Sequence, residues 1–237
     1  MIEGRLVAVD LETTGLNPKT ERILEIGAVL VENGKVKDRF SALIDPKRQI
    51  SQRIVELTGI TDEMVAGKPD IQEALPEFLK FCKDYPLLGH HIIFDYSFLK
   101  RAAVNQGYSF ERTGIDTLAV CRKFIPENEK KNLQAACKWF QVQTEKSHRA
   151  LEDALAAYRL YEAMEQKYGG KYPEVFSPKE LKYKVKREHP ASKRQKEVLQ
   201  YLIKYHKINL SVQLDDLSKN EASRLTDQII SQYGRIQ

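Results

Sequence analysis

The feature that most constrains this fold is a short apolar run that ends in two carboxylic acids. Residues 6–9 read Leu-Val-Ala-Val, and Asp10 and Glu12 follow on either side of Leu11. The run predicts a buried strand over residues 5–10, and because side chains alternate across a strand, the two acids project together. Carboxylates that share a buried face repel each other and are costly to desolvate, which a divalent cation would relieve. The pattern therefore predicts a metal site on a sheet.

Two later segments offer partners for this pair of acids. Asp95 follows a strand predicted over 86–90, and Asp153 lies near the start of a helical pattern that runs from about 149 to 168. On that helix Asp153 heads an apolar row, so we expect it to face inward toward the metal; the alternative is a carboxylate placed only to favour a helix N-terminus. His148 lies about 140° away on an ideal helix, so it can share the site only from a loop before the first turn. Histidine titrates near neutral pH, which suits a proton acceptor.

The remaining pattern predicts an α/β domain with three layers. Asn33-Gly34 is a hairpin signal between strands predicted over 22–32 and 35–44, and a fifth strand is expected near Ile115. Apolar residues recur at helical spacing in several segments, with predicted helices starting at 61 and covering about 71–82, 94–106, 133–140 and 149–168. Hairpins followed by strand–helix alternation indicate a mixed five-stranded sheet covered by helices.

Composition excludes several classes of protein. The chain has no run of 18 apolar residues, which argues against a membrane partner or span, and its first five residues lack the apolar core of a secretion signal. Three widely spaced cysteines fit neither a disulfide framework nor a zinc pair. We therefore expect reduced thiols and a cytoplasmic protein.

Positive charge is concentrated in one segment of the chain. Residues 179–207 hold 10 Lys and Arg against 3 Asp and Glu, whereas residues 1–178 hold 25 against 26. We expect a catalytic domain over 1–170, a basic linker over 171–190 and a small module over 191–237.

The predicted module reads as a helix, an extended piece and a helix. Ser192 with Gln195 and Ser218 with Glu221 match the capping box, and an amphipathic run follows each box. One apolar stripe contains residues 198, 199, 202 and 203, the other residues 222, 225 and 229, and residues 210–217 lie between them. The basic residues that precede the module could contact the phosphates of a nucleic acid. Equally, they could form a solvated linker, with the module packed on the catalytic domain.

Three motifs carry a family resemblance. Residues 9–15 (Val-Asp-Leu-Glu-Thr-Thr-Gly), 94–99 (Phe-Asp-Tyr-Ser-Phe-Leu) and 148–154 (His-Arg-Ala-Leu-Glu-Asp-Ala) resemble the three exonuclease motifs of the histidine-type branch of the DEDD superfamily. The order and spacing are similar to those of the epsilon proofreading subunits of bacterial DNA polymerase III and of ribonuclease T. The likeness covers about residues 4–168.

The resemblance implies a ribonuclease H-like fold and stepwise hydrolysis from a 3′ end that releases nucleoside monophosphates. It implies that Asp10 bridges two metal ions, that Glu12 and Asp153 hold the ion that activates water, and that Asp95 helps to hold the other. His148 would then accept the proton. Ligand sets made only of oxygen favour Mg²⁺ or Mn²⁺.

The same resemblance suggests residues that meet the substrate. The backbone of Thr13 and Thr14 and the side chain of Leu16 would contact the terminal nucleotide, and Phe94 would lie near the penultimate base, although each could equally belong to a turn or the core. Thr58 lies in a segment, 57–61, that is similar to one lining the family's substrate cleft. His91 stands where relatives usually have asparagine, which bears on rate and substrate preference more than on the reaction.

Three functions are consistent with these motifs. The first is a 3′–5′ exonuclease acting on single-stranded DNA 3′ ends, free-standing or bound to a DNA polymerase, although no motif in the module identifies such a partner. The second is an exoribonuclease acting on RNA ends or short oligoribonucleotides. The third, a nucleic-acid adaptor without catalysis, is disfavoured because Asp10, Glu12, Asp95, His148 and Asp153 are all present. We favour DNA as the substrate.

Overall fold

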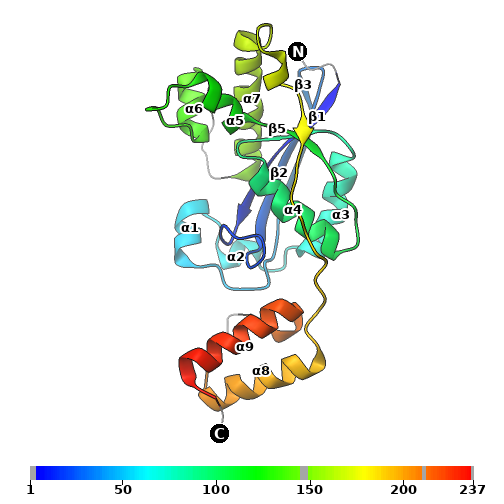
Figure 1. Cartoon of the computed structure of the whole chain (residues 1–237), viewed down its shortest axis with the longest axis vertical. Helices are drawn as coiled ribbons and strands as arrows, with labels where there is room; N and C mark the ends of the chain where they lie inside the picture. The colour runs from blue at the N-terminus through cyan, green and yellow to red at the C-terminus, as the bar shows by residue number, and fades with distance from the viewer. Residues whose placement is uncertain (1–3, 145–148, 210–211, 236–237) are drawn as a thin grey trace.

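A mixed sheet forms the centre of the computed structural model, which describes residues 4–144, 149–209 and 212–235 (Figure 1). Its strands lie in the order β3-β2-β1-β4-β5-β6, with β1, β4 and β5 parallel and the other pairs antiparallel. The strand bounds are β1 Arg5–Thr13, β2 Ile23–Glu32, β3 Lys35–Leu43, β4 Leu87–Gly89, β5 Thr113–Asp116 and β6 Lys179–Glu180. The mixed sheet confirms the predicted α/β class, but with six strands in place of five.

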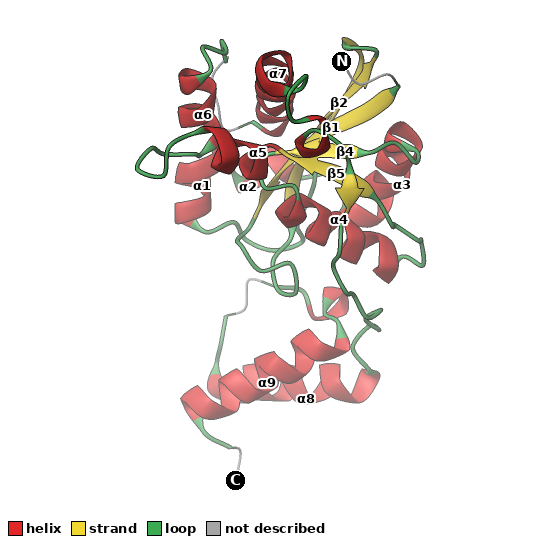
Figure 2. Ribbon diagram, turned by 45° about the horizontal axis from the view of Figure 1, so that its top comes forward, coloured by secondary structure: helices red, strands yellow, loops and turns green. Residues whose placement is uncertain are grey.

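Helices cover both faces of this sheet (Figure 2). Their bounds are α1 Gln52–Thr58, α2 Asp62–Val65, α3 Ile71–Cys82, α4 Ile93–Asn105, α5 Thr117–Phe124, α6 Leu133–Trp139, α7 Ala150–Tyr168, α8 Lys193–His206 and α9 Lys219–Tyr233. The core on one face joins β1 and β2 to α5, α6 and α7, and the core on the other joins them to α3 and α4. Sequence patterns did not predict α1 and α5, which are short and lack a long apolar repeat.

Alternation along β1 decides where the acids point. Leu6 and Ala8 belong to the core under α7, whereas Val7, Val9 and Leu11 belong to the core under α3 and α4. Asp10 and Glu12 continue the row of Leu6 and Ala8, because every second residue shares a face. The two acids therefore lie on the α7 side of the sheet.

The sixth strand forms inside the segment predicted to be a linker. β6 pairs with β5, and the next residue, Leu181, is buried against Gly114, where a Cβ atom would lie 2.8 Å from Leu181 Cδ1. Phe176 is also buried, in the core that contains α7. This part of 171–190 packs on the sheet and its helices because it supplies two apolar side chains and an edge strand, which its high lysine content obscures in the sequence.

The C-terminal helices α8 and α9 begin as predicted. Both capping boxes are formed, at Ser192 with Gln195 and at Ser218 with Glu221. The two helices share a core with the connection between them; its buried members are residues 191, 199, 202, 217, 222 and 229. We refer to residues 191–235 as the C-terminal module.

Two details of the module differ from expectation. Val198 is 42% exposed, since a helix packed against one partner buries only a narrow stripe. Residues 214–216 form a 3₁₀ turn where an extended piece was expected, and positions 210 and 211 lie outside the described residues.

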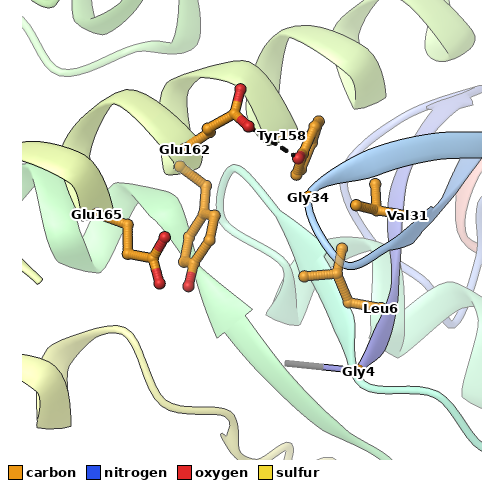
Figure 3. Close-up of a pocket in the computed structure, with 8 residues that line it drawn as sticks. Gly4, Leu6, Val31, Gly34, Tyr158, Glu162 and Glu165 are labelled. Carbon is orange, nitrogen blue, oxygen red and sulfur yellow. Dashed lines mark hydrogen bonds between the residues drawn. The ribbon is translucent and has the colours of Figure 1, made fainter. Parts of the chain in front are cut away.

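All three cysteines, Cys82, Cys121 and Cys137, are buried and unpaired. Among the described residues no helix has both the length and the apolar character needed to cross a bilayer. A small cavity of about 20 Å³ lies between the start of β1, the β2–β3 hairpin and α7, where Tyr158 Oη donates a 3.2 Å hydrogen bond to Glu162 (Figure 3). It is at the end of β1 opposite to Asp10 and Glu12, so it is separate from the site described next.

Candidate active site

Three carboxylates meet where β1 passes under the first turn of α7. Oxygen atoms of Asp10, Glu12 and Asp153 all lie within 4.8 Å of one another. Strand alternation brings the first two together, and the third comes from a helix more than a hundred residues later in the chain. Three anionic oxygen donors at this spacing suit a hard divalent cation.

A glycine admits the start of α7 to this position. Gly27 pairs with Asp10 in the β1–β2 ladder, and a Cβ atom on it would lie 2.1 Å from the carbonyl carbon of Ala150 and from the amide nitrogen of Leu151. Real atoms do not approach so closely, so any side chain would push the helix, and Asp153 with it, away from β1.

An ion pair with a buried carboxylate holds the same helix end. Glu25, opposite Glu12 in the β1–β2 ladder, is fully buried. Its Oε1 accepts a 2.7 Å bond from Arg149 Nη2, and its Oε2 accepts bonds from Arg149 Nε at 3.1 Å and the Ala150 amide at 3.2 Å. Bidentate arginine–carboxylate pairs are strong and directional. Sequence reasoning missed Glu25, although a single charge within an apolar strand was a signal that it has a partner.

Asp95 lies beside this group but outside it. Its side chain is 3% exposed, and its Oδ1 accepts a 3.0 Å hydrogen bond from the Leu11 amide. This bond ties Asp95 to β1, and the charge of Asp95 adds to burial in raising the pKa of Asp10. That place beside Asp10 is compatible with the expectation that Asp95 helps to hold a second ion.

Burial and the closeness of these carboxylates raise the pKa of two of them. Burial and the charges of Asp153 and Glu25 raise the pKa of Glu12 to about 7, with Arg149 opposing the shift. Burial, followed by the charges of Asp95 and Glu12, holds the pKa of Asp10 well above its usual range. Carboxyl groups whose pKa is raised by burial and by neighbouring acids can exchange their protons for a divalent cation. The donor set therefore fits the metal that the motifs imply.

The residues expected to meet the terminal nucleotide lie at the end of β1 and in the loop after it. Leu16 is 85% exposed, an unusual position for leucine and one free to contact a base or sugar. Thr13 is nearly buried and its Oγ1 donates a 2.8 Å bond to the Gly15 carbonyl. Thr14 Oγ1 donates to Glu21 at 2.7 Å and accepts from the Arg22 amide at 2.9 Å.

The other candidates divide between core and surface. The Thr58 hydroxyl is buried and serves the end of α1, donating to the Ile54 carbonyl at 2.9 Å and accepting from the Ile60 amide at 3.1 Å. Phe94 is half-buried, with its ring centroid 5.1 Å from that of Phe98. His148 lies outside the described residues.

His91 has a backbone conformation that explains its unusual identity. Its φ angle is +73°, its side chain is exposed, and its amide donates a 2.9 Å bond to Asp116 Oδ1. Asparagine and histidine are both enriched in this left-handed region among non-glycine residues. The replacement of the expected asparagine therefore preserves the turn.

Comparisons with known proteins agree with this geometry. Residues 7–161 match the family model described as Exonuclease (RNase_T). The chain is 35% identical over 162 residues to the DNA polymerase III epsilon subunit of Aquifex aeolicus, covering 68% of this chain and 80% of that one. It is also 39% identical over 166 residues to DNA polymerase III PolC-type of Caldanaerobacter subterraneus subsp. tengcongensis, covering 70% of this chain. It spans only 12% of that protein and a similar share of the other PolC-type relatives.

Solved structures show the same fold. Exonuclease X in complex with 5′ overhanging duplex DNA superimposes with a TM-score of 0.54 at 27% identity, over 73% of this chain and 99% of that one. Escherichia coli exonuclease I in complex with a dT13 oligonucleotide gives a TM-score of 0.61 at 18% identity, over 73% and 43%. On the family match, the epsilon relative and the carboxylate site together, the chain belongs to the exonuclease family of the DEDD type.

Proposed function

We propose that this protein is a metal-dependent 3′–5′ exonuclease that removes nucleoside monophosphates from DNA 3′ ends. The observation that carries the proposal is the convergence of Asp10, Glu12 and Asp153 at one point of the sheet. Support for DNA comes from the relatives, which are named as DNA polymerase III components, and from the structural neighbours, whose structures contain DNA.

The residues fit distinct roles in phosphodiester hydrolysis. Asp10, Glu12 and Asp153 would hold Mg²⁺ or Mn²⁺, with Asp95 assisting a second ion beside Asp10. Such a pair of ions stabilises the attacking and leaving oxygens of an in-line displacement. His148 would accept the proton of the attacking water, and the exposed Leu16 would pack on the terminal nucleotide.

A substrate panel tests this proposal. The full-length protein is incubated with 5′-labelled single-stranded DNA, duplex DNA with a 3′ mismatch and RNA of the same sequence, each with Mg²⁺, Mn²⁺ or EDTA. We expect a ladder that shortens from the 3′ end, only with metal, and faster on DNA. Products cut only internally would contradict the exonuclease assignment, and faster shortening of RNA would replace it with an exoribonuclease.

A mismatch preference would point to a proofreading role in the bacterial cytoplasm next to a polymerase. Faster removal of a mispaired than of a paired 3′ nucleotide supports that role, since fraying exposes the mispaired end. Equal rates would favour a free-standing nuclease that trims single strands.

A further inference from the structure

One carboxylate connects the C-terminal module to the exonuclease fold. Glu221 is 8% exposed, and its Oε1 lies 2.5 Å from Arg22 Nη2 and 3.5 Å from Arg48 Nη2. Its other oxygen, Oε2, accepts a 2.9 Å bond from the Ser218 amide within the capping box of α9. The residue that completes the capping box of α9 is thus also the residue that pairs with two arginines of the catalytic fold.

Arginines also hold the backbone of the loop that follows β1. We call residues 14–22 the substrate loop, because they include Thr14 and Leu16. The Lys19 carbonyl accepts bonds from Arg101 of α4 at 3.1 Å and from Arg224 of α9 at 3.5 Å, and the Thr20 carbonyl accepts one from Arg48 at 2.8 Å. Side chains from the module and from the fold therefore converge on the same few carbonyl groups.

The contact reaches the residues expected to bind the nucleotide. The Thr14 amide donates to the Arg22 carbonyl at 2.8 Å, and the Arg22 amide donates to Thr14 Oγ1 at 2.9 Å. Arg22 therefore fixes Thr14 with its backbone while its side chain binds Glu221. Glu221 and Arg22 therefore connect α9 to Thr14, the first residue of the substrate loop.

A second pair holds the entry to the module. Arg101 Nη2 lies 2.5 Å from Glu188 Oε2, and the Glu188 Oε1 accepts a 3.0 Å bond from Asn220 Nδ2 of α9. The Glu188 amide donates to Asn105 Oδ1 at 3.0 Å. In both views the module accordingly lies against the end of the exonuclease fold where α4 is drawn (Figures 1 and 2). This geometry favours a docked module over one on a solvated linker.

We propose that the C-terminal module is a positioning element of the exonuclease, which uses Glu221 to hold the substrate loop in the conformation that receives the 3′-terminal nucleotide. The catalytic part of this inference rests on the proposed function. The immobilisation of residues 14–22 does not, and it can be measured without any substrate.

The test compares full-length variants of the ion pair. Glu221→Gln removes the charge but retains a capping box, because glutamine at the equivalent position, Gln195, forms the box of α8. Arg22→Gln changes the partner on the catalytic fold, so it leaves the module intact. Asp215→Asn is the matched control: its carboxylate pairs with Lys196 inside the module and is 88% exposed.

Two measurements are made on each variant. Amide hydrogen exchange of residues 14–22, without nucleic acid, should become about tenfold faster in Glu221→Gln and Arg22→Gln, because local opening no longer breaks an ion pair. On a 5′-labelled single-stranded DNA, KM should rise about fivefold while kcat changes less than twofold, since substrate binding but not the metal site is altered. The double variant should match the more affected single one, and Asp215→Asn should match the wild type.

The outcomes separate the two proposals. Unchanged exchange in both ion-pair variants would overturn the bracing of the loop, and faster exchange with unchanged KM would overturn its role in substrate positioning. If the wild type itself releases no nucleotides, the proposed exonuclease function fails, and the exchange data still decide whether α9 braces the loop.

Discussion

Two sites in the described part of this molecule hold carboxylates in opposite surroundings. On β1, Asp10 and Glu12 face Asp153, while the nearby Arg149 is paired with Glu25. At the module interface, Glu221 faces two arginines. Burial and neighbouring acids raise the pKa of Glu12 to about 7. Burial also acts to raise the pKa of Glu221, but Arg22 and the Ser218 bonds outweigh it and lower that pKa.

This difference in neighbouring charge indicates which of the two sites would bind a cation from solution. The carboxylates of the interface are neutralised by the chain itself, so they stabilise the contact between module and fold. Around Asp10 and Glu12, burial and the neighbouring acids raise the pKa of both carboxyl groups, and a divalent metal ion would relieve the repulsion between the acids. The predictions below test this contrast, from the largest expected effect to the smallest.

Removal of one sheet carboxylate should have the largest effect. Asp10→Asn should lower the rate of nucleotide release about 10⁴-fold, because a bound metal supplies several kcal/mol of transition-state stabilisation. The metal-free variant should nevertheless melt at a higher temperature than the wild type, since one repulsive charge is gone. Rate assays and thermal melts in EDTA check both effects, with the exposed Asp38→Asn as control. An active Asp10→Asn enzyme would remove the basis of the metal site.

The effect of the proposed proton acceptor, His148, should be separable from that of the proposed metal ligands. His148→Ala should slow cleavage by about 10²–10⁴-fold, the usual contribution of a general base. Mn²⁺ affinity, measured by calorimetry, should remain near that of the wild type, in contrast to Asp10→Asn. Full activity of His148→Ala across neutral pH would require a different base.

Loss of Arg149 should convert the paired Glu25 into another unpaired acid. Arg149→Met should lower the free energy of unfolding by about 2–4 kcal/mol, the cost of a buried charge without its partner, reduced here because Arg149 is half-exposed. Adding Glu25→Gln should recover part of that loss. Urea titrations measure both variants against Arg159→Met, which removes a guanidinium from the same helix. A double variant no more stable than Arg149→Met would show that charge pairing is not what holds this helix end.

The two sites should respond to pH with opposite signs. The Glu12 pKa is about 7 when folded against an ordinary 4.5, so the folded protein binds the extra proton between these values, and stability without metal should fall as pH rises through 7. Glu221 has a lowered pKa, so its contribution is present above its ordinary pKa and is lost as pH falls below it. Melting curves in EDTA and in Mn²⁺ should therefore differ by a few degrees more at pH 8 than at pH 5. An equal metal effect at both pH values would contradict the assignment.

The smallest effect is expected at His91. His91→Asn should change the free energy of unfolding by less than about 0.5 kcal/mol, because both residues accept a positive φ angle. His91→Val should cost about 1–2 kcal/mol at the same position, since a β-branched side chain strains this backbone. Equal stability of the two variants would show that the left-handed turn is not needed.

Local patterns in the sequence predicted much of this structure. The strand that carries Asp10 and Glu12, the Asn33-Gly34 hairpin and both capping boxes depend on neighbouring residues, and all formed as expected. The meeting of Asp10, Glu12 and Asp153 also followed from local signals, because strand alternation and the apolar row behind Asp153 each indicated the direction of a side chain.

The remaining features depend on contacts between distant segments. Three contacts join residues that no local sequence pattern relates. They are the close packing of Gly27 against Ala150, the ion pair of Glu25 with Arg149, and the packing of Leu181 on Gly114. The docking of Glu221 on Arg22 is of the same kind. Within the basic stretch it is an acid, Glu188, that pairs with the fold, through Arg101, and the net positive charge of the stretch gave no sign of this contact.

The burial of all three cysteines makes the native chain a convenient platform for chemical labelling. Burial raises the pKa of Cys121 to about 12 and that of Cys137 to about 11, and it also raises the pKa of Cys82. Maleimides react with thiolates, so these buried thiols should not react while the protein is folded. A single Ser231→Cys substitution, at an exposed position near the end of α9, would then carry the only reactive sulfur. A fluorophore there would follow the module on individual molecules with every native cysteine in place.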